Sequence, residues 1–198
     1  VSSAGDLDIT ETTGSLTIVG AGAGLTIIDA RSIERVFHIL GGATLNLEGV
    51  TVTGGLVTGS EDGGGIRNDG GTVSIIDSVI TGNVSQDDAG GINNTGNLTL
   101  TRVTVSNNSA ARTGGGIRNS GNLTINASTI GGTSDPADPL ASDLRNKSVL
   151  AGGGIVNLGT GVLTINNSTI AGNVATSSAA QGAGLYSIGT ASLTNVTI

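Results

Sequence analysis

One short motif, three small residues followed by an aliphatic residue, recurs along this chain and limits the folds that it can adopt. The sequence reads GGGI up to Ile66, AGGI up to Ile92, GGGI up to Ile117 and Ile155, and GAGL up to Leu185. Successive aliphatic residues of the motif are 26, 25, 38 and 30 positions apart. A repeat of this length is typical of solenoids, in which each unit buries its apolar side chains against the next unit.

Each motif is followed by two short apolar runs with a period of two residues. After Ile117, the first run contains Leu123 and Ile125, and the second run ends at Ile130. This period points alternate side chains inward, as in a β-strand, and no helical spacing is sustained. With looser copies upstream of Ile66, about seven units are present. We therefore expect an all-β chain, a right-handed parallel β-helix of about seven coils with three short strands each, its hand following the rule for parallel crossovers.

The composition is compatible with an aliphatic core and excludes several classes of partner. Phe37 and Tyr186 are the only aromatic residues, and the absence of cysteine rules out a disulfide framework. A net charge of −7 leaves no basic stripe for nucleic acid. No apolar run approaches ~18 residues, so we expect no membrane span. Because the chain begins at Val1, we interpret it as processed, or as part of a longer polypeptide or assembly.

The interval between Ile117 and Ile155 is 13 residues longer than the interval before it. The extra residues fall within the segment 133–151, which contains two Asp-Pro pairs and little periodicity. We expect this segment to be a loop that protrudes from one corner of a single solenoid domain spanning residues 1–198. We also expect the fold to survive removal of the segment.

Asparagine recurs at two fixed positions of the unit. The first column contains Asn68, Asn94, Asn119 and Asn157, and the second contains Asn83, Asn108 and Asn173, with Thr133 interrupting it. Stacked amides can hydrogen-bond up and down a solenoid and satisfy backbone groups at turns. Their spacing is that of the coil, so we interpret both columns as structural ladders; ligand binding by the amides is the alternative.

Two further stretches carry a resemblance to known proteins. The glycine motif followed by ITGN, from Ile80 to Asn83, or by IAGN, from Ile170 to Asn173, resembles the paired GGAI and FxxN repeats of bacterial polymorphic outer-membrane proteins. The opening stretch GDLDITETTGSLTIVGAGAGLTIIDA is similar to the first coils of large secreted bacterial β-helix proteins of the pectate-lyase-like superfamily. The resemblance covers nearly the whole chain and implies an extracellular or cell-surface location.

Threonine and serine form two outward columns. One follows the first apolar residue of the second strand and contains Thr17, Ser74, Thr99, Thr124, Thr164 and Thr194. The other precedes the last apolar residue of the third strand and contains Thr51, Thr104, Thr129, Thr169 and Thr197. A flat Thr array can order water and bind ice, but Thr is also a favourable exposed β residue.

Acidic residues gather just before two of the glycine motifs. Glu61 and Asp62 precede one motif, and Asp87 and Asp88 occupy the same place in the next coil. Clustered carboxylate and carbonyl oxygens suit hard cations such as Ca²⁺. These four residues are therefore candidate metal ligands, with a solvated acidic edge as the alternative, and no other cofactor is expected.

A polysaccharide lyase or hydrolase on this fold needs an acid–base pair, or Ca²⁺ with a basic residue, in a groove. His38 is the only histidine and lies in an apolar run. Arg35, Arg67 and Arg118 could supply a basic face, but no pattern places a base beside two carboxylates. The sequence therefore predicts no catalytic residues and no enzymatic activity.

These patterns favour a structural function, as a scaffold or adhesion segment of a bacterial surface or secreted protein. Neither end shows a cap, since inward residues begin at Leu7 and Ile9 and continue to Ile198. Uncapped solenoid ends expose strand edges, so we expect another subunit or the rest of the polypeptide to stack on them. A carbohydrate-binding or polysaccharide-cleaving module, with a surface glycan as ligand, is the alternative, and an ice-binding Thr array is the third possibility.

Overall fold

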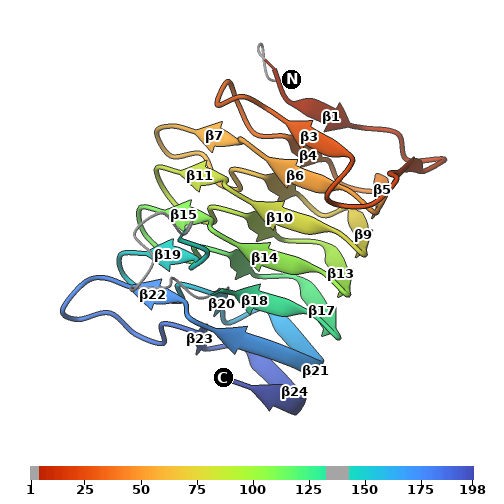
Figure 1. Cartoon of the computed structure of the whole chain (residues 1–198). Coiled ribbons are helices and arrows are strands. Elements are labelled where there is room, and N and C mark those ends of the chain that lie inside the picture. The colour runs from red at the N-terminus through yellow and green to blue at the C-terminus, as the bar shows by residue number, and fades with distance from the viewer. Residues whose placement is uncertain (1–4, 133–142) are drawn as a thin grey trace.

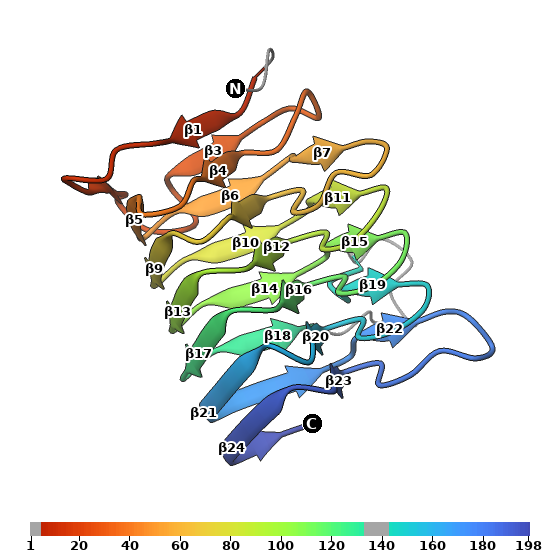
Figure 2. The same ribbon diagram turned by 180° about the vertical axis from the view of Figure 1, so that it is seen from behind.

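The computed structural model describes residues 5–132 and 143–198 and is a parallel β-solenoid of about six turns (Figures 1 and 2). Neighbouring strands along each sheet come from successive coils and run parallel. No helix occurs in the described ranges. The predicted all-β solenoid is confirmed, with slightly fewer turns than the seven expected.

Three sheets run along the solenoid. The first contains β1 (Leu7–Ile9), β4 (Phe37–Ile39), β8 (Ile66–Asn68), β12 (Ile92–Asn94), β16 (Ile117–Asn119), β20 (Ile155–Asn157) and β23 (Leu185–Ser187). The second contains β2 (Leu16–Val19), β5 (Thr44–Glu48), β9 (Thr72–Ile76), β13 (Asn97–Thr101), β17 (Asn122–Asn126), β21 (Val162–Ala171) and β24 (Thr190–Thr197), and continues through β18 (Thr129–Gly131), β14 (Thr104–Ser106), β10 (Val79–Thr81), β6 (Thr51–Thr53) and β3 (Ile27–Asp29).

The third sheet consists of two-residue strands and was not predicted. It contains β7 (Leu56–Val57), β11 (Val84–Ser85), β15 (Ser109–Ala110), β19 (Lys147–Ser148) and β22 (Val174–Ala175). Two residues are too few to show a period of two, so the sequence gives no local signal for these strands.

Like residues stack on one another in the core, because successive coils pair in register. Ile92 pairs with Ile66 on one side and with Ile117 on the other, and all three are fully buried. Leu98 pairs in the same way with Val73 and Leu123. Burying one such side chain contributes about 1.5–3 kcal/mol. The aliphatic columns therefore hold the coils together without aromatic residues.

Residues in the left-handed backbone region form the corner between the two halves of the second sheet. Asp77, Arg102, Ala127, Asn167 and Asn195 have φ angles between 48° and 55°. The register of the flanking strands places them at one position of successive coils. The chain therefore turns at the same point in each coil, and the two halves of the sheet meet at an angle (Figure 1).

The glycines of the repeated motif are required by the close approach of neighbouring coils. A Cβ atom on Gly116 would lie 2.6 Å from the carbonyl oxygen of Gly154, and one on Gly91 would lie 2.5 Å from that of Gly116. Real Cβ atoms essentially never approach other atoms so closely. Only glycine therefore fits this position in the stacked coils.

The first asparagine ladder runs beside the apolar core and is fully buried. The Nδ2 atom of Asn68 donates to Oδ1 of Asn94 at 2.7 Å, and Asn94 donates to Asn119 at 2.7 Å. Asn119 donates in turn to Asn157 at 2.8 Å, and Asn157 donates to the Ser187 hydroxyl at 3.0 Å. Each amide hydrogen bond thus joins one coil to the next.

The second ladder includes a residue that the sequence pattern did not identify. Asn83 donates to Asn108 at 3.0 Å, Asn108 donates to Asn146 at 3.1 Å, and Asn146 donates to Asn173 at 3.0 Å. Thr133, which was predicted to interrupt this column, lies outside the described residues. Asn146 comes from the segment that was predicted to be a loop.

The end of that segment belongs to the coil. Lys147 and Ser148 form β19, which pairs with β15 and β22. Ala151 forms bridges to Thr113 and Gln181 in the adjacent coils. The prediction that all of 133–151 is a dispensable loop is therefore wrong for residues 146–151. The sequence did not reveal their place in the coil, because one ladder amide and two strand residues are too few to produce a periodic pattern.

Candidate functional site

The outward face of the first sheet carries a column of side chains that changes in character along the solenoid. Register places Asp8, His38, Arg67, Asn93, Arg118, Val156 and Tyr186 in this column. Asp8, Arg67 and Arg118 are its charged members, whereas Val156 and Tyr186, at the C-terminal end, are uncharged. Acidic residues from the adjoining turns line the charged part.

Arginine and carboxylate side chains form a network at the N-terminal part of this face. Arg67 donates through Nε to Asp69 and through a terminal nitrogen to Glu61, both at 2.8 Å. The same Glu61 oxygen accepts a hydrogen bond from Arg35 at 2.6 Å. The Arg35 side chain is only 5% exposed. A charge this deeply buried requires partners of opposite sign, and the surrounding carboxylates supply them.

His38 lies between two carboxylates, so the expectation that no base lies beside two of them is wrong. Its Nε2 atom is 3.0 Å from Oδ2 of Asp69, and its Nδ1 atom is 3.3 Å from Oδ1 of Asp8. Asp8 and His38 pair across β1 and β4, and Asp69 follows β8 in the next coil. The sequence signal was the shared position of Asp8 and His38 in successive coils.

Two of the predicted metal ligands, Asp62 and Asp88, are engaged within the protein. Asp62 accepts a hydrogen bond from the Asp88 backbone N–H at 3.2 Å, and Arg118 lies 3.8 Å from its other oxygen. Burial raises the pKa of the Asp62 carboxyl, while the positive charge of Arg118 acts in the opposite direction. Asp88 accepts hydrogen bonds from the backbone N–H and the hydroxyl of Thr113, at 2.9 and 2.7 Å.

The other two predicted metal ligands are bound by arginine. Asp87 accepts a hydrogen bond from Arg112 at 2.8 Å, and Glu61 accepts from the two arginines of the network. In the described part of the chain, the acidic and histidine ligand atoms that converge as at a metal site belong instead to Asp6, Asp8 and His38.

The first Thr/Ser column differs from the predicted one at two points. Asn46 lies between Thr17 and Ser74, and the column ends at Ser192. Thr194 pairs instead with Asn166, two residues further along the strand. The column thus passes through Thr99, Thr124 and Thr164 but mixes Thr, Ser and Asn.

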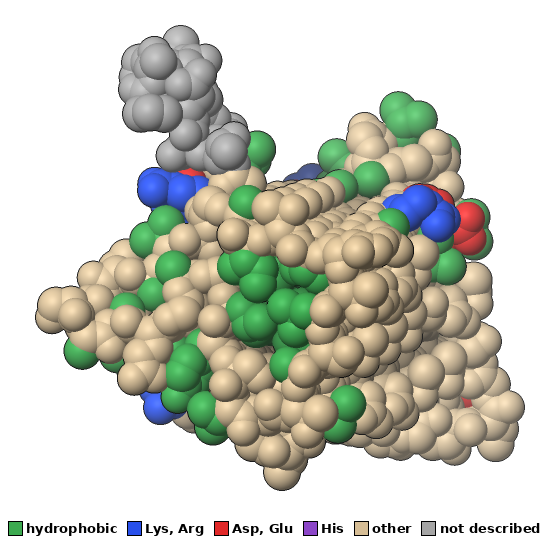
Figure 3. Space-filling view, turned by 90° about the horizontal axis from the view of Figure 1, so that it is seen from below, with side chains coloured by type: hydrophobic (Ala, Val, Ile, Leu, Met, Phe, Trp, Pro, Cys, Tyr) green, Lys and Arg blue, Asp and Glu red, His purple; other side chains and the backbone are tan. Residues whose placement is uncertain are grey.

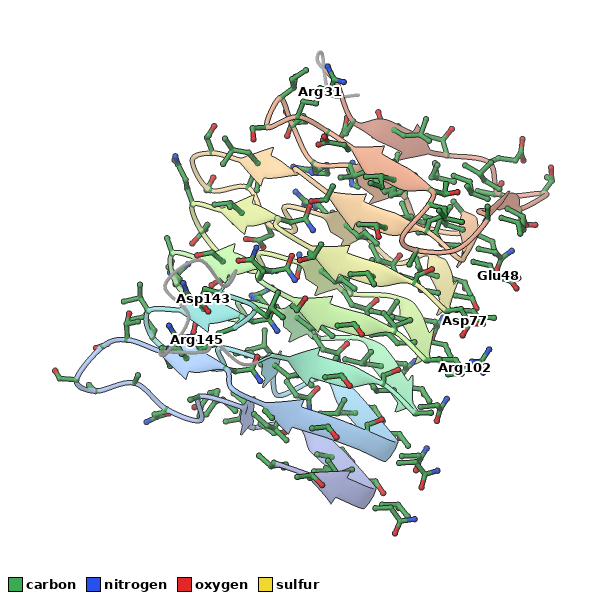
Figure 4. All side chains as sticks on the ribbon, in the orientation of Figure 1. Arg31, Glu48, Asp77, Arg102, Asp143 and Arg145 are labelled. Carbon is green, nitrogen blue, oxygen red and sulfur yellow. The ribbon has the colours of Figure 1, made fainter. Side chains whose placement is uncertain are left out.

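The second column, Thr51, Thr104, Thr129, Thr169 and Thr197, lies beyond the left-handed corner. Register places Val79 between Thr51 and Thr104, so an aliphatic residue interrupts this column. The corner itself carries exposed charges, including Asp77 and Arg102, whose carboxylate and guanidinium groups are joined by hydrogen bonds of 2.6 and 2.8 Å (Figure 4). The two columns therefore face different directions, and a charged corner separates them.

The C-terminal end of the solenoid is open, apolar and uncharged. Residues 148–198 contain no Asp, Glu, Lys, Arg, His or Pro. β23 pairs only with β20 and β24 only with β21, so one edge of each strand has no partner among the described residues. Leu193 is 39% and Ile198 is 67% exposed, and Figure 3 shows apolar side chains gathered in the middle of this end.

The N-terminal end is also open. Two hollows of about 280 and 310 Å³ lie at the first coil, and Leu7 lines both of them. Leu7, whose partner in the next coil is the fully buried Phe37, is 48% exposed. Both ends of the described solenoid therefore present strand edges and core-type side chains to solvent.

No protein family, curated protein or solved structure matches this chain. In residues 5–132 and 143–198, no helix has the length and apolar character needed to cross a membrane.

Proposed function

We propose that this chain is a structural segment of an extracellular scaffold whose end coils are covered by protein, either by another copy stacked end to end or by the rest of a longer polypeptide. In the stacked form, the N-terminal coil of one copy covers the C-terminal coil of the next. The observation that carries this proposal is the open, uncharged C-terminal edge formed by β23 and β24.

An unprotected strand edge is a template for pairing with another chain. Natural sheets protect their edges with charged residues, proline, bulges or a covering segment. Residues 174–198, which form the last coil, contain neither charged residues nor proline. A covering strand satisfies the free backbone groups and removes Leu193 and Ile198 from water.

A second copy of the chain is a suitable cover, because its N-terminal coil has matching strands. If the register of the solenoid continues between copies, Leu7 of one copy lies next to Leu185 of the other, and Thr17 lies next to Ser192. The hollows beside Leu7 can accept apolar side chains from the covering copy. Head-to-tail contact between the unlike ends of a rod does not close into a ring, so it generates a filament.

The extracellular location of this scaffold is supported by the resemblance of the repeats to those of bacterial polymorphic outer-membrane proteins. ITGN at Ile80 and IAGN at Ile170 follow the glycine motif in two coils of the solenoid. A rigid rod with few charges in its last coils suits a spacer between other parts of a surface protein.

The test is the molar mass of residues 1–198 by light scattering over a dilution series. We expect the mass to rise with concentration, and we expect Ile198→Lys to abolish the rise by placing a charge at the contact. The matched control is Val162→Lys, because Val162 is 44% exposed but points outward from β21, on the side of the rod.

Self-association that is lost in Ile198→Lys and kept in Val162→Lys supports stacking. A monomer at every concentration contradicts it, as does association that both variants retain. A monomer that binds a glycan would favour the carbohydrate-binding alternative.

A further inference from the structure

At the N-terminal end of the outward face of the first sheet, beside the arginine–carboxylate network, the side chains of Asp6, Asp8 and His38 converge. One potential ligand atom from each of these side chains lies within 4.8 Å of the other two. Nδ1 of His38 lies 3.3 Å from Oδ1 of Asp8. Ligand atoms at 2.0–2.1 Å from a tetrahedral metal are about 3.3–3.4 Å apart. The spacing of this pair therefore fits an ion shared between them.

Two carboxylate oxygens of this group are buried without a hydrogen-bond donor among the described residues. They are Oδ2 of Asp6 and Oδ1 of Asp8. The Asp6 side chain is only 1% exposed, and the nearest charged nitrogen, Nε of Arg35, is 3.8 Å away and also lacks an acceptor. A buried carboxylate oxygen that accepts no hydrogen bond is costly, so both oxygens favour a cation bound close to them.

The surroundings of His38 point to the same conclusion. Both ring nitrogens face carboxylate oxygens, from Asp69 on one side and Asp8 on the other. An imidazole with a free lone pair on Nδ1 can bind a cation beside Asp8 while Nε2–H donates to Asp69, whereas a doubly protonated ring would donate to both carboxylates. The two arrangements differ in whether Nδ1 carries a metal or a proton, which NMR of the ring nitrogens distinguishes.

We propose that Asp6, Asp8 and His38 bind a first-row transition-metal dication such as Zn²⁺. The ligand atoms are Oδ2 of Asp6, Oδ1 of Asp8 and Nδ1 of His38. Imidazole together with carboxylate suits this class of metal better than Ca²⁺ or Mg²⁺, which prefer oxygen ligands alone. The site joins β1 to β4, so the bound metal fastens the first coil to the second.

Asp69 and Arg67 orient the histidine from outside the coordination shell. Asp69 accepts from Nε2 of His38, which fixes the ring with Nδ1 toward the metal, and Arg67 holds Asp69 at 2.8 Å. A carboxylate that accepts the second N–H of a metal-bound histidine is a common feature of such sites. Asp69 is therefore a positioning residue and not a ligand.

The experiment is a Zn²⁺ titration of the tag-free, metal-stripped chain, followed by calorimetry and by NMR of the imidazole nitrogens. Because His38 is the only histidine, one pair of ring resonances reports the site. We expect one Zn²⁺ per chain, with the Nδ1 resonance moving to the metal-bound range and Nε2 remaining protonated. Asp6→Asn and Asp8→Asn should abolish saturable binding, and Asp69→Asn should weaken it by about 10–100-fold.

Asp87→Asn is the matched control, because Asp87 loses the same charge but contacts Arg112 in another part of the face. We expect this variant to bind Zn²⁺ like the unmodified chain. The site would be refuted by a lack of saturable binding, by binding that survives in Asp6→Asn and Asp8→Asn, or by Zn²⁺ on Nε2. The NMR measurement on the unmodified chain decides the question even if a variant fails to fold.

Discussion

The buried amide ladder implies that Asn119 stabilises the solenoid strongly. Its Oδ1 accepts from Asn94 at 2.7 Å, and its Nδ2 donates to Asn157 at 2.8 Å and to the carbonyl of Gly121 at 3.0 Å. Asn119→Ala removes all three hydrogen bonds and leaves a small void. Asn157 then loses the only side-chain donor to its Oδ1 in the described structure, whereas the Gly121 carbonyl keeps a backbone N–H from Val162.

The expected cost follows from these contacts. A hydrogen bond contributes about 1 kcal/mol net, and a buried acceptor left without a donor costs about 1–3 kcal/mol. We therefore expect Asn119→Ala to lower the free energy of unfolding by about 4 kcal/mol. For a chain of this size, that is a large share of the total stability.

Asn122→Ala is the matched control in the same coil. Asn122 also donates to a neighbouring asparagine, Asn97, at 2.9 Å, but on the exposed face. Its loss should cost less than about 1 kcal/mol. The assay is urea unfolding followed by circular dichroism, with a second probe to verify two-state behaviour. If Asn119→Ala costs no more than Asn122→Ala, the ladder does not stabilise the fold as argued.

Three further substitutions follow from the same structure. Gly116→Ala should destabilise the fold by about 1–3 kcal/mol or more, because the added methyl group would overlap a backbone oxygen of the next coil. The control, Gly159→Ala, should be nearly neutral, because the added methyl group meets no atom within 4 Å. Thermal unfolding of the two variants compares them. Ala127→Asn should stabilise the fold by up to about 1 kcal/mol, because Ala127 has a φ of 48° and asparagine tolerates the left-handed backbone region better than alanine. Ala111→Asn should not stabilise the fold, because the backbone at Ala111 does not have a positive φ. Burial raises the pKa of Asp62 in the folded state, so its favourable contribution is present below its ordinary pKa of 3.8 and is lost as the pH rises through the folded value. Asp62→Asn should therefore gain stability relative to the unmodified chain between about pH 3.5 and pH 7, and an equal difference at both pH values would contradict this reasoning.

The parts of the fold that could be predicted from the sequence are those with a local, repeated signal. The column through Ile66, Ile92 and Ile117 repeats at nearly constant spacing, and inward alternation follows from strand geometry. Asn146 escaped prediction because its place in the second ladder depends on how a longer coil closes. The pairing of Thr194 with Asn166 was not predicted, because the register of the last coil is set by its contact with β21.

In the candidate site, too, some features could be predicted from the repeat pattern and others could not. The positions of Asp8 and His38 in successive coils could be read from the sequence. Predicting that they pair would have required the strand register between two copies of the repeat that resemble each other only weakly. The approach of Asp69 and the burial of Asp6 depend on how turns fold over the sheet. Such contacts between turns carry no periodic signal.

End-to-end stacking can be tested most directly by disulfide trapping, since the chain has no cysteine of its own. Thr17 in β2 begins the first outward column and Ser192 in β24 ends it, so stacking in continuous register places them on adjacent strands. Adjacent strands lie about 4.8 Å apart, within the Cα separation of about 4.4–6.8 Å that a disulfide spans. Oxidation of the Thr17→Cys, Ser192→Cys double variant should give a ladder of covalent oligomers on a non-reducing gel, with each single variant giving at most dimers. A double variant that also stops at dimers would contradict head-to-tail stacking.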